Sequence, residues 1–295
     1  MAKEHSRMTQ PPDVRGFFDP ATHTVTYLVS DPATGQAAII DPVLDFDAPS
    51  ARTSTRSIDA VMAALRSEGL TLALVLETHA HADHLTAAAH LRAMTGVSIG
   101  IGGRITQVQS AFGPLFGADD VRPDGAVFDH LHADGDAFAL GDLTVEVIHT
   151  PGHTPACVSY RIGDAVFTGD TLFMPDYGTA RTDFPGGDAR TLYRSIQRLL
   201  GLPDETRIFV GHDYLPQGRT DYRFETTVVE QRAHNIHIGG GVSEDAFVAM
   251  REARDATLGA PQLILPSLQV NIRAGDLPPP DANGQRYLRL PLNAI

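Results

Sequence analysis

Four side chains that commonly bind metal ions occur within six residues of this chain. His79, His81, Asp83 and His84 form the segment HAHADH, in which only two small alanines separate them. Imidazole and carboxylate groups suit zinc, iron or manganese, and ligands on one short loop are already close together before the chain folds. Burying four such groups without compensating partners would be costly. The cluster therefore predicts a metal centre.

Three later residues share one local form and are further ligand candidates. His153, Asp170 and His212 each directly follow a glycine, and each glycine follows a segment that is typical of a β-strand. Glycine lets the backbone turn sharply, so that the next side chain projects from the edge of a sheet. We expect these three side chains to converge on the HAHADH segment.

The elements that must position these residues are strands that end at the ligand turns. A strand is expected at 72–76, directly before the cluster, and a helix at 85–94 after it. Strands at 143–148, 165–167 and 207–210 precede the three later ligand candidates. Further strands are expected at 14–18, 24–30, 37–40 and 157–161, further helices at 57–67, 188–200, 225–235 and 243–254, and an extended segment at 263–292. This order favours an α/β sandwich of two mixed sheets with helices on the outer faces.

Composition indicates a globular protein with a sizeable core. Hydrophobic residues make up 42% of the 295 residues and charged residues 20%. We expect one domain over 14–295, preceded by a flexible lead-in at 1–13 that is polar and holds two prolines.

Charge and cysteine content narrow the partners and the compartment. The net charge of -13 argues against binding to nucleic acid or to an anionic membrane surface. Because Cys157 is the single cysteine, no intrachain disulfide can form, which favours the reducing cytoplasm. We expect its side chain to be a small buried hydrophobe. The sequence has neither an apolar leader core nor a run of 18 apolar residues, so no signal peptide and no membrane span is expected.

The motifs together resemble the metallo-β-lactamase superfamily. Its H-x-H-x-D-H, His, Asp, His order is matched between Thr78 and His212. A narrower resemblance, to the persulfide dioxygenases of the ethylmalonic-encephalopathy-protein type and especially their bacterial subgroup, extends from about Gly16 to the C-terminus. It is carried by ETHAHADH (Glu77–His84), TPGHT (Thr150–Thr154), FTGD (Phe167–Asp170), MPDYGTA (Met174–Ala180), RTDF (Arg181–Phe184) and GHDY (Gly211–Tyr214). The resemblance implies the αββα sandwich of this fold, with metals at one end between the sheets.

Two chemistries remain open on these residues. The ligand inventory alone favours a zinc-dependent hydrolase of the glyoxalase II type, acting on a glutathione thioester or a lactone. One ion would then bind His79, His81 and His153. The second would bind Asp83, His84 and His212, with Asp170 as the bridge. A third reading, a metal-storing or regulatory binding module, is the least favoured because so polar an open site is costly to keep without use.

The resemblance instead implies a dioxygenase with one Fe(II) per chain. The iron would be held by His79, His153 and Asp170, and this two-histidine, one-carboxylate face leaves positions open for a thiolate and O2. The implied reaction converts glutathione persulfide, O2 and water to sulfite and glutathione. His81, Asp83, His84 and His212 would then surround the site and orient the ligands. Zinc is a natural replacement ion, because it binds such ligands more tightly than Fe(II).

Arg181 and Tyr214 are the predicted substrate contacts. The guanidinium of Arg181 can pair bidentately with a glutathione carboxylate, and the Tyr214 hydroxyl can donate to the site. Weaker candidates for the same anion are Arg219, Arg223 and Arg273. The histidines outside the pattern are assigned to surface or structural roles: His130, His132, His149, His234 and His237. A homodimer is the default expectation for the assembly.

Overall fold

The computed structural model describes residues 10–294, in which apolar side chains alternate between two faces of each central strand. Along β3 (Gln36–Ile40), Ala38 and Ile40 join a core on one face, whereas Ala37 and Ile39 join a core on the other. Because successive side chains on a strand point to opposite faces, a strand that is apolar throughout must be covered on both sides.

Two six-stranded sheets supply the inner layers, and both are mixed. The first has the order β1-β2-β3-β6-β8-β9 and is parallel from β3 onward; the second has the order β10-β11-β12-β13-β14-β15, with only β13 and β14 parallel. Besides β3, the first sheet contains β1 (Asp13–Asp19), β2 (Thr24–Ser30), β6 (Thr71–Glu77), β8 (Ser98–Gly102) and β9 (His130–His132). The second contains β10 (Ala137–Leu140), β11 (Leu143–His149), β12 (Val158–Ile162), β13 (Ala165–Phe167), β14 (Arg207–Phe209) and β15 (Glu225–Thr227). A small sheet, ordered β5-β4-β7, joins β4 (Val43–Asp47), β5 (Arg52–Ser54) and β7 (Leu85–Thr86).

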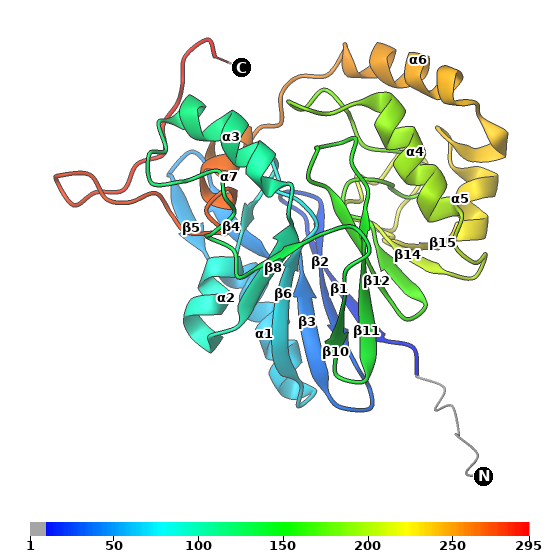
Figure 1. Ribbon diagram of the computed structural model, residues 1–295, viewed down its shortest axis with the longest axis horizontal. Coiled ribbons are helices and arrows are strands. Elements are labelled where there is room, and N and C mark those ends of the chain that lie inside the picture. Colours follow the sequence, from blue (N-terminus) through cyan, green and yellow to red (C-terminus); the bar gives the residue numbers. More distant parts are fainter. Residues whose placement is uncertain (1–9, 295) are drawn as a thin grey trace.

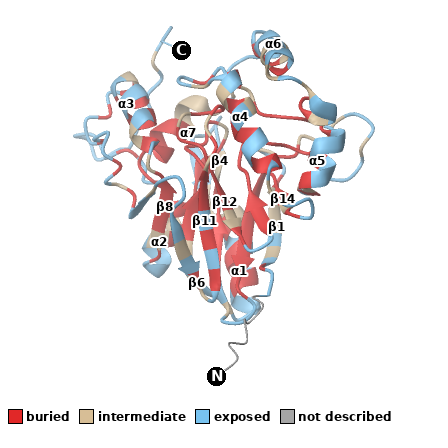
Figure 2. Ribbon diagram, turned by 45° about the vertical axis from the view of Figure 1, so that its right-hand side comes forward, coloured by how far each residue is buried: buried red, intermediate tan, exposed pale blue. Residues whose placement is uncertain are grey.

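Helices cover the outer face of each sheet, as Figure 1 shows. The helices that share a core with the first sheet are α1 (Arg56–Ser67), α2 (Ala88–Thr95), α3 (Ile105–Phe116) and α7 (Ile264–Asn271). Those that share a core with the second are α4 (Ala189–Leu200), α5 (Val228–His234) and α6 (Glu244–Asp255), with a short 3-10 turn, η1, at Gly239–Gly241. The strands between them are largely buried (Figure 2). The predicted αββα sandwich is thus confirmed.

The strand directions bring the ligand turns to one rim of the sandwich. Strands β3 and β6 are parallel, and so are β13 and β14; β11 runs in the direction of β13 because both pair antiparallel with β12. The two sheets meet at this rim, where the backbone N–H of Val25 donates to the carbonyl of Gly211 at 2.9 Å. The turns after β6, β11, β13 and β14 therefore open onto the same edge, as the glycine turns predicted.

The structure corrects three expected elements. The segment 263–292 is not extended throughout, because α7 occupies Ile264–Asn271; Pro266 lies in its first turn, where a backbone N–H has no partner within the helix anyway. The expected helix at 225–235 begins as strand β15, and the helix itself starts at Val228 behind the capping box of Thr227 and Glu230. The expected helix at 85–94 likewise begins as strand β7.

Two further observations concern the ends of the chain and the helices. Most of the predicted lead-in, residues 1–9, lies outside the described residues, and β1 begins at Asp13. Within the described range, the helices are too short and too polar to cross a bilayer.

Candidate metal centre

His79, His153 and Asp170 meet at the rim with their ligand atoms within 4.8 Å of one another. His79 follows β6, His153 follows β11, and Asp170 follows β13. Oδ2 of Asp170 lies 4.0 Å from Nε2 of His79 and 3.7 Å from Nε2 of His153. All three side chains are buried, and Nε2 of His79 has no hydrogen-bond partner. This group is the one that the family resemblance implied as the iron ligands.

The spacing of these three atoms suits a metal ion. Atoms separated by about 4 Å surround a point roughly 2.3–2.5 Å from each of them, close to the metal–nitrogen and metal–oxygen bonds of about 2.0–2.2 Å found in proteins. Shifts of a few tenths of an ångström would complete the coordination. Nε2 of His79 has no hydrogen-bond partner, and the buried Nε2 atoms of His81, His84 and His212 have none either. Orphaned buried polar atoms are otherwise costly, so the histidine cluster as a whole calls for bound metal.

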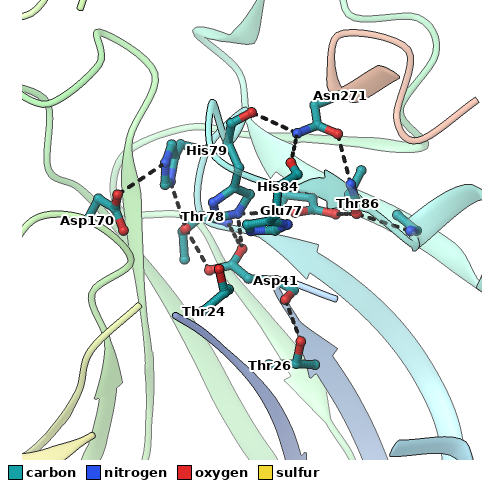
Figure 3. Close-up of polar contacts among 12 residues, drawn as sticks. Thr24, Thr26, Asp41, Glu77, Thr78, His79, His84, Thr86, Asp170 and Asn271 are labelled. Atoms are coloured by element: carbon teal, nitrogen blue, oxygen red, sulfur yellow. Dashed lines mark hydrogen bonds and ion pairs between the residues drawn. The ribbon is translucent and has the colours of Figure 1, made fainter. Parts of the chain in front are cut away.

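Hydrogen bonds fix the two histidine rings so that Nε2 faces the centre. The Oγ1 atom of Thr78 lies 3.0 Å from Nδ1 of His79 and donates its own proton to Asp41 at 2.8 Å. Nδ1 of His153 lies 2.9 Å from the carbonyl oxygen of Arg181, to which it donates. Both rings therefore carry the proton on Nδ1, which leaves Nε2 free for a metal. Figure 3 shows the chain from Asp170 through His79 and Thr78 to Asp41.

The glycines before the ligands allow close approaches between turns. Gly169 has φ +48, and a Cβ there would collide with Thr78; Gly152 has φ +139, and a Cβ would collide with the backbone of α4. Gly211 does not need a left-handed conformation, but a Cβ on it would lie 2.8 Å from Oδ1 of Asp170. The backbone must therefore pass directly beside the ligands.

His81, Asp83 and His212 form a second group with ligand spacing. Nε2 of His212 lies 3.3 Å from Oδ2 of Asp83 and 3.2 Å from Oδ1 of Asp170. His81 is also part of a third group, because its Nε2 lies 3.0 Å from Asp41 and 3.6 Å from Glu77. The His81 ring also packs on that of His79, with 4.0 Å between centroids, but His81 falls in the two ligand groups that do not contain His79 and His153.

His84 belongs to none of the three ligand groups found in residues 10–294. Its Nδ1 lies 3.1 Å from the carbonyl of Leu85, and its ring packs on that of His81 at 4.2 Å between centroids. The loop that carries both histidines is held from the C-terminal side: the Asn271 amide donates to the carbonyls of His81 and His84, each at 2.8 Å. Figure 3 shows Asn271 beside His84 and Thr86.

The pKa shifts at the centre favour protonation states in which His79 and Asp170 can bind a metal ion. Burial, with repulsion from His81, lowers the pKa of His79 well below its usual range and keeps the ring neutral. Burial alone would raise the pKa of Asp170, but His212 and the two other histidines lower it well below its usual range. Burial opposes the charging of His212, yet the carboxylates of Asp170 and Asp83 raise its pKa to about 9. A neutral imidazole and an ionised carboxylate are the forms that bind metals.

A cavity of about 430 Å³ opens beside the centre, lined on one side by His153 and Asp170. Both predicted substrate residues, Arg181 and Tyr214, line it. The Tyr214 ring stacks on His212 with 5.3 Å between centroids. The guanidinium of Arg181 is already engaged, because it donates to Asp183 at 2.5 Å through both Nε and Nη2 and to the carbonyl of Gly259 at 2.8 Å.

The weaker arginine candidates are placed elsewhere, and two other arginines take their place. Arg219 is paired with Asp213 and Asp176, Arg273 is buried and paired with Asp120, and neither they nor Arg223 lines the cavity. Arg251 and Arg254 of α6 do line it. Sequence reasoning missed them because arginines on a polar helix carry no signal that separates a cavity wall from an ordinary surface.

Cys157 and His237 lie in surroundings that indicate a structural role. Cys157 is buried, and burial raises the pKa of its thiol to about 12, which argues against a nucleophilic role. His237, the most buried of the histidines outside the pattern, accepts the backbone N–H of Thr179 at 3.0 Å.

Comparison with known proteins identifies similar chains along most of this length. The profile of the metallo-beta-lactamase superfamily matches residues 19–212. A probable metallo-hydrolase of Burkholderia pseudomallei is 53% identical over 96% of this chain and 99% of its own length. Glyoxylase B2 of Dictyostelium discoideum is 48% identical over 91% of this chain and 92% of its own length. The mitochondrial persulfide dioxygenase ETHE1 of Bos taurus is 32% identical over 94% of each chain.

A solved structure and some longer relatives complete the comparison. The crystal structure of ETHE1 from Myxococcus xanthus superimposes with a TM-score of 0.72 and 34% identity, covering 90% of this chain and 100% of that one. The beta-lactamase hydrolase-like protein of Xylella fastidiosa is 52% identical over 97% of this chain, but the chain spans only 66% of that protein's length.

Proposed function

Because this chain belongs to the metallo-beta-lactamase superfamily, we propose that it is an iron-dependent dioxygenase that oxidises the terminal sulfur of glutathione persulfide. The overall reaction consumes one glutathione persulfide, one O2 and one water, and yields glutathione, sulfite and two protons. Both oxygens of O2 pass to the sulfur, water supplies the third oxygen, and the sulfur–sulfur bond breaks to release the thiol.

One observation carries the proposal: the ligand atoms gather as two histidines and one carboxylate. His79, His153 and Asp170 form a complete group. His81 belongs to two other groups, one with Asp83 and His212 and one with Asp41 and Glu77, and His84 falls outside every ligand group of the described residues. A bound iron would supply activation of O2 next to the persulfide sulfur, for which such a face leaves positions open. The 32% identity to a persulfide dioxygenase over 94% of the chain supports the same reading.

The residues around the ligands have roles that follow from their contacts. His212 lies on the Oδ1 side of Asp170 and leaves Oδ2 to the ligand group. Burial raises the pKa of Tyr214 well above its usual range, so the hydroxyl keeps its proton and can donate to an anionic sulfur in the cavity. The aromatic rings of Phe173, Tyr177 and Tyr214 line the same cavity and pack on one another.

A two-metal hydrolase is the second candidate, and specific observations favour it. His81, Asp83 and His212 could hold another ion beside the first group, and two relatives of 53% and 48% identity carry the names probable metallo-hydrolase and glyoxylase B2. The ligand sets expected for that enzyme differ from the groups in this structure, because His81 would join His79 and His84 would join His212.

Metal content and product analysis separate the two candidates. We expect about one iron per chain in anaerobically purified protein, O2 uptake that depends on glutathione persulfide, and sulfite as the product. Two zinc ions per chain, with hydrolysis of S-lactoylglutathione and no O2 uptake, would refute the dioxygenase.

Substitution of two residues sharpens the same test. His84→Asn, which keeps an N–H in place of Nδ1 but removes Nε2, should retain stoichiometric iron and O2 uptake, whereas Asp170→Ala should lose both. His234→Ala, at an exposed histidine, controls for nonspecific metal binding. If His84→Asn loses one of two bound ions, the hydrolase assignment is correct instead.

A further inference from the structure

Three arginines line the cavity beside the metal centre, together with the carboxylates of Asp83 and Asp170. Arg181 lies in the RTDF segment, and Arg251 and Arg254 lie in the last turn and a half of α6. This local concentration of positive charge stands against a net charge of -13 for the chain. A cavity of about 430 Å³ falls within the range of sites that hold small-molecule ligands.

Two of the three guanidinium groups are already neutralised by carboxylates. Arg181 is paired with Asp183, and its remaining Nη1 donates to the carbonyl of Gly259. Arg251 is 1% exposed; its Nε and Nη2 both donate to Asp255, and its Nη1 donates to the carbonyl of Thr179. Neither guanidinium has two free N–H groups that could bind a ligand carboxylate unless one of these ion pairs within the chain breaks.

Arg254 is different, because no carboxylate of the described residues lies within ion-pair distance of it. Its side chain is exposed at the cavity, beside the Tyr177 hydroxyl, whose pKa burial raises while Arg254 and Arg251 lower it in part. The Tyr177 ring lies 4.9 Å from that of Tyr214, which stacks on His212. The guanidinium therefore faces the same cavity as the metal ligands, across two tyrosine rings.

The position of Arg254 relative to the centre is fixed by its neighbours on α6. The hydrogen bond from Arg251 to the carbonyl of Thr179 ties α6 to the Met174–Ala180 segment, and Asp255 accepts the backbone N–H of Thr182 at 2.8 Å. Both contacts reach the stretch of chain whose Arg181 carbonyl orients His153. Arg254 thus lies on a helix that buried contacts of Arg251 and Asp255 hold in place.

We propose that Arg254 is a specificity-determining residue that binds a carboxylate of the substrate remote from the reacting sulfur. This inference rests on the proposed function for the identity of the ligand, since glutathione carries two carboxylates and an unpaired guanidinium can bind one bidentately. Arg181, the substrate residue predicted from the sequence, also lines the cavity, where its guanidinium is paired with Asp183.

Binding of glutathione itself tests the inference without requiring turnover. By anaerobic calorimetry on the iron-loaded protein, Arg254→Ala should bind glutathione roughly tenfold or more weakly, and Arg254→Lys should recover part of the loss. Arg122→Ala removes the same charge at an exposed site outside the cavity and should bind as wild type. Equal dissociation constants for Arg254→Ala and wild type would overturn the inference, as would a wild type that does not bind glutathione.

A modified ligand identifies the group that Arg254 recognises. Glutathione diethyl ester, in which both carboxylates are blocked, should bind wild type as weakly as glutathione binds Arg254→Ala, and the substitution should not weaken it further. If Arg254→Ala lowers the affinity for the diester as much as that for glutathione, the residue does not recognise a carboxylate.

Steady-state kinetics separate this inference from the proposed function. With glutathione persulfide, Arg254→Ala should raise KM about tenfold and leave kcat within twofold, because the contact is made equally in the bound substrate and in the transition state. If the wild type consumes no O2 but glutathione binding still depends on Arg254, the proposed function fails and the inference stands. If O2 uptake is normal and Arg254→Ala leaves KM unchanged, the inference fails and the proposed function stands.

Discussion

A single hydroxyl group connects a metal ligand to a buried carboxylate. Thr78 donates to Oδ2 of Asp41 through its side chain and to Oδ1 through its backbone N–H at 2.7 Å, and its oxygen faces Nδ1 of His79. Asp41 follows β3, in a conformation with φ 50, and is 3% exposed. The carboxylate thereby orients His79 through the threonine, as partners of metal-bound histidines commonly do.

Replacing Thr78 by valine, which has almost the same shape, tests this link. Thr78→Val should weaken iron binding by roughly 10–100-fold, since the ring of His79 loses the partner of its Nδ1 proton. It should also lower the free energy of unfolding by about 1–3 kcal/mol, because one buried oxygen of Asp41 loses its donor. The affinity is measured by competition with a chelator, and the stability by urea unfolding.

Thr78→Ser keeps the hydroxyl and should restore most of the affinity. Thr257→Val, at an exposed threonine, should change neither quantity. Wild-type iron affinity in Thr78→Val would show that the hydroxyl does not position the ligand.

At the scale of single residues, the sequence predicts ligand types better than their pairing. All seven ligand candidates could be found from their residue types and their turns, whereas the choice of His79, His153 and Asp170 among them is implied only by the family resemblance. Which ligand group His81 and His84 join could not be predicted, because it depends on Asp41, which lies 37 residues before Thr78 in the sequence. The hydrogen bonds that engage the Arg181 guanidinium likewise depend on where Asp183 and the Gly259 carbonyl lie in the folded chain.

The C-terminal helix α7 fixes the loop that carries the histidine cluster. Its last residue, Asn271, is 2% exposed; the side chain donates to the carbonyls of His81 and His84 and accepts the backbone N–H of Thr86 at 2.9 Å. One amide about 190 residues away in the sequence thus pairs with three backbone groups of the loop and of β7.

Substitution of Asn271 should destabilise the loop and the fold together. Asn271→Leu, of similar volume, leaves three backbone groups without this partner and should lower the free energy of unfolding by about 3 kcal/mol or more. Asn271→Asp keeps the acceptor for Thr86 but turns a carboxylate toward two carbonyl oxygens, so it too should be less stable and bind iron more weakly.

A second asparagine provides the control for this prediction. Asn283→Ala, at an exposed position, should stay within about 0.5 kcal/mol of wild type in urea unfolding. If Asn271→Asp is as stable as wild type and retains its iron, the amide does not hold the loop.

At the scale of elements, the sequence predicts the helices that have a capping residue and a regular spacing of apolar residues. Helix α4 is the clearest case, because Asp188 caps it and its apolar residues follow one face. Helix α7 gives neither signal: it has no side-chain cap, it contains Pro266, and its last five residues, Ser267 to Asn271, are all buried, so no polar face alternates with an apolar one. The role of Asn271 could therefore not be foreseen.

The whole molecule places the metal centre where its two sheets meet. His79 comes from the first sheet, whereas His153 and Asp170 come from the second. This arrangement explains why the fold could be recognised from the order of the motifs: ligands from distant segments converge only if the strands before them share one rim. A bound ion would therefore also crosslink the two halves of the sandwich.

Removal of the metal should therefore lower the stability of the entire fold. An ion that binds only the folded chain, at a concentration 100 times its Kd, stabilises it by about 2.7 kcal/mol. For a chain of this size that difference corresponds to a fall in Tm of roughly 4 °C on chelation. Differential scanning calorimetry with and without excess chelator measures the shift. Asp170→Asn, which removes the charged ligand of the group, should show the lower Tm in both conditions, since it has no ion to lose. A wild-type Tm that is insensitive to chelation while the iron is demonstrably released would mean that the two sheets do not depend on the ion for their cohesion, and that the packed core of Val145, Val147 and their neighbours between the sheets is sufficient.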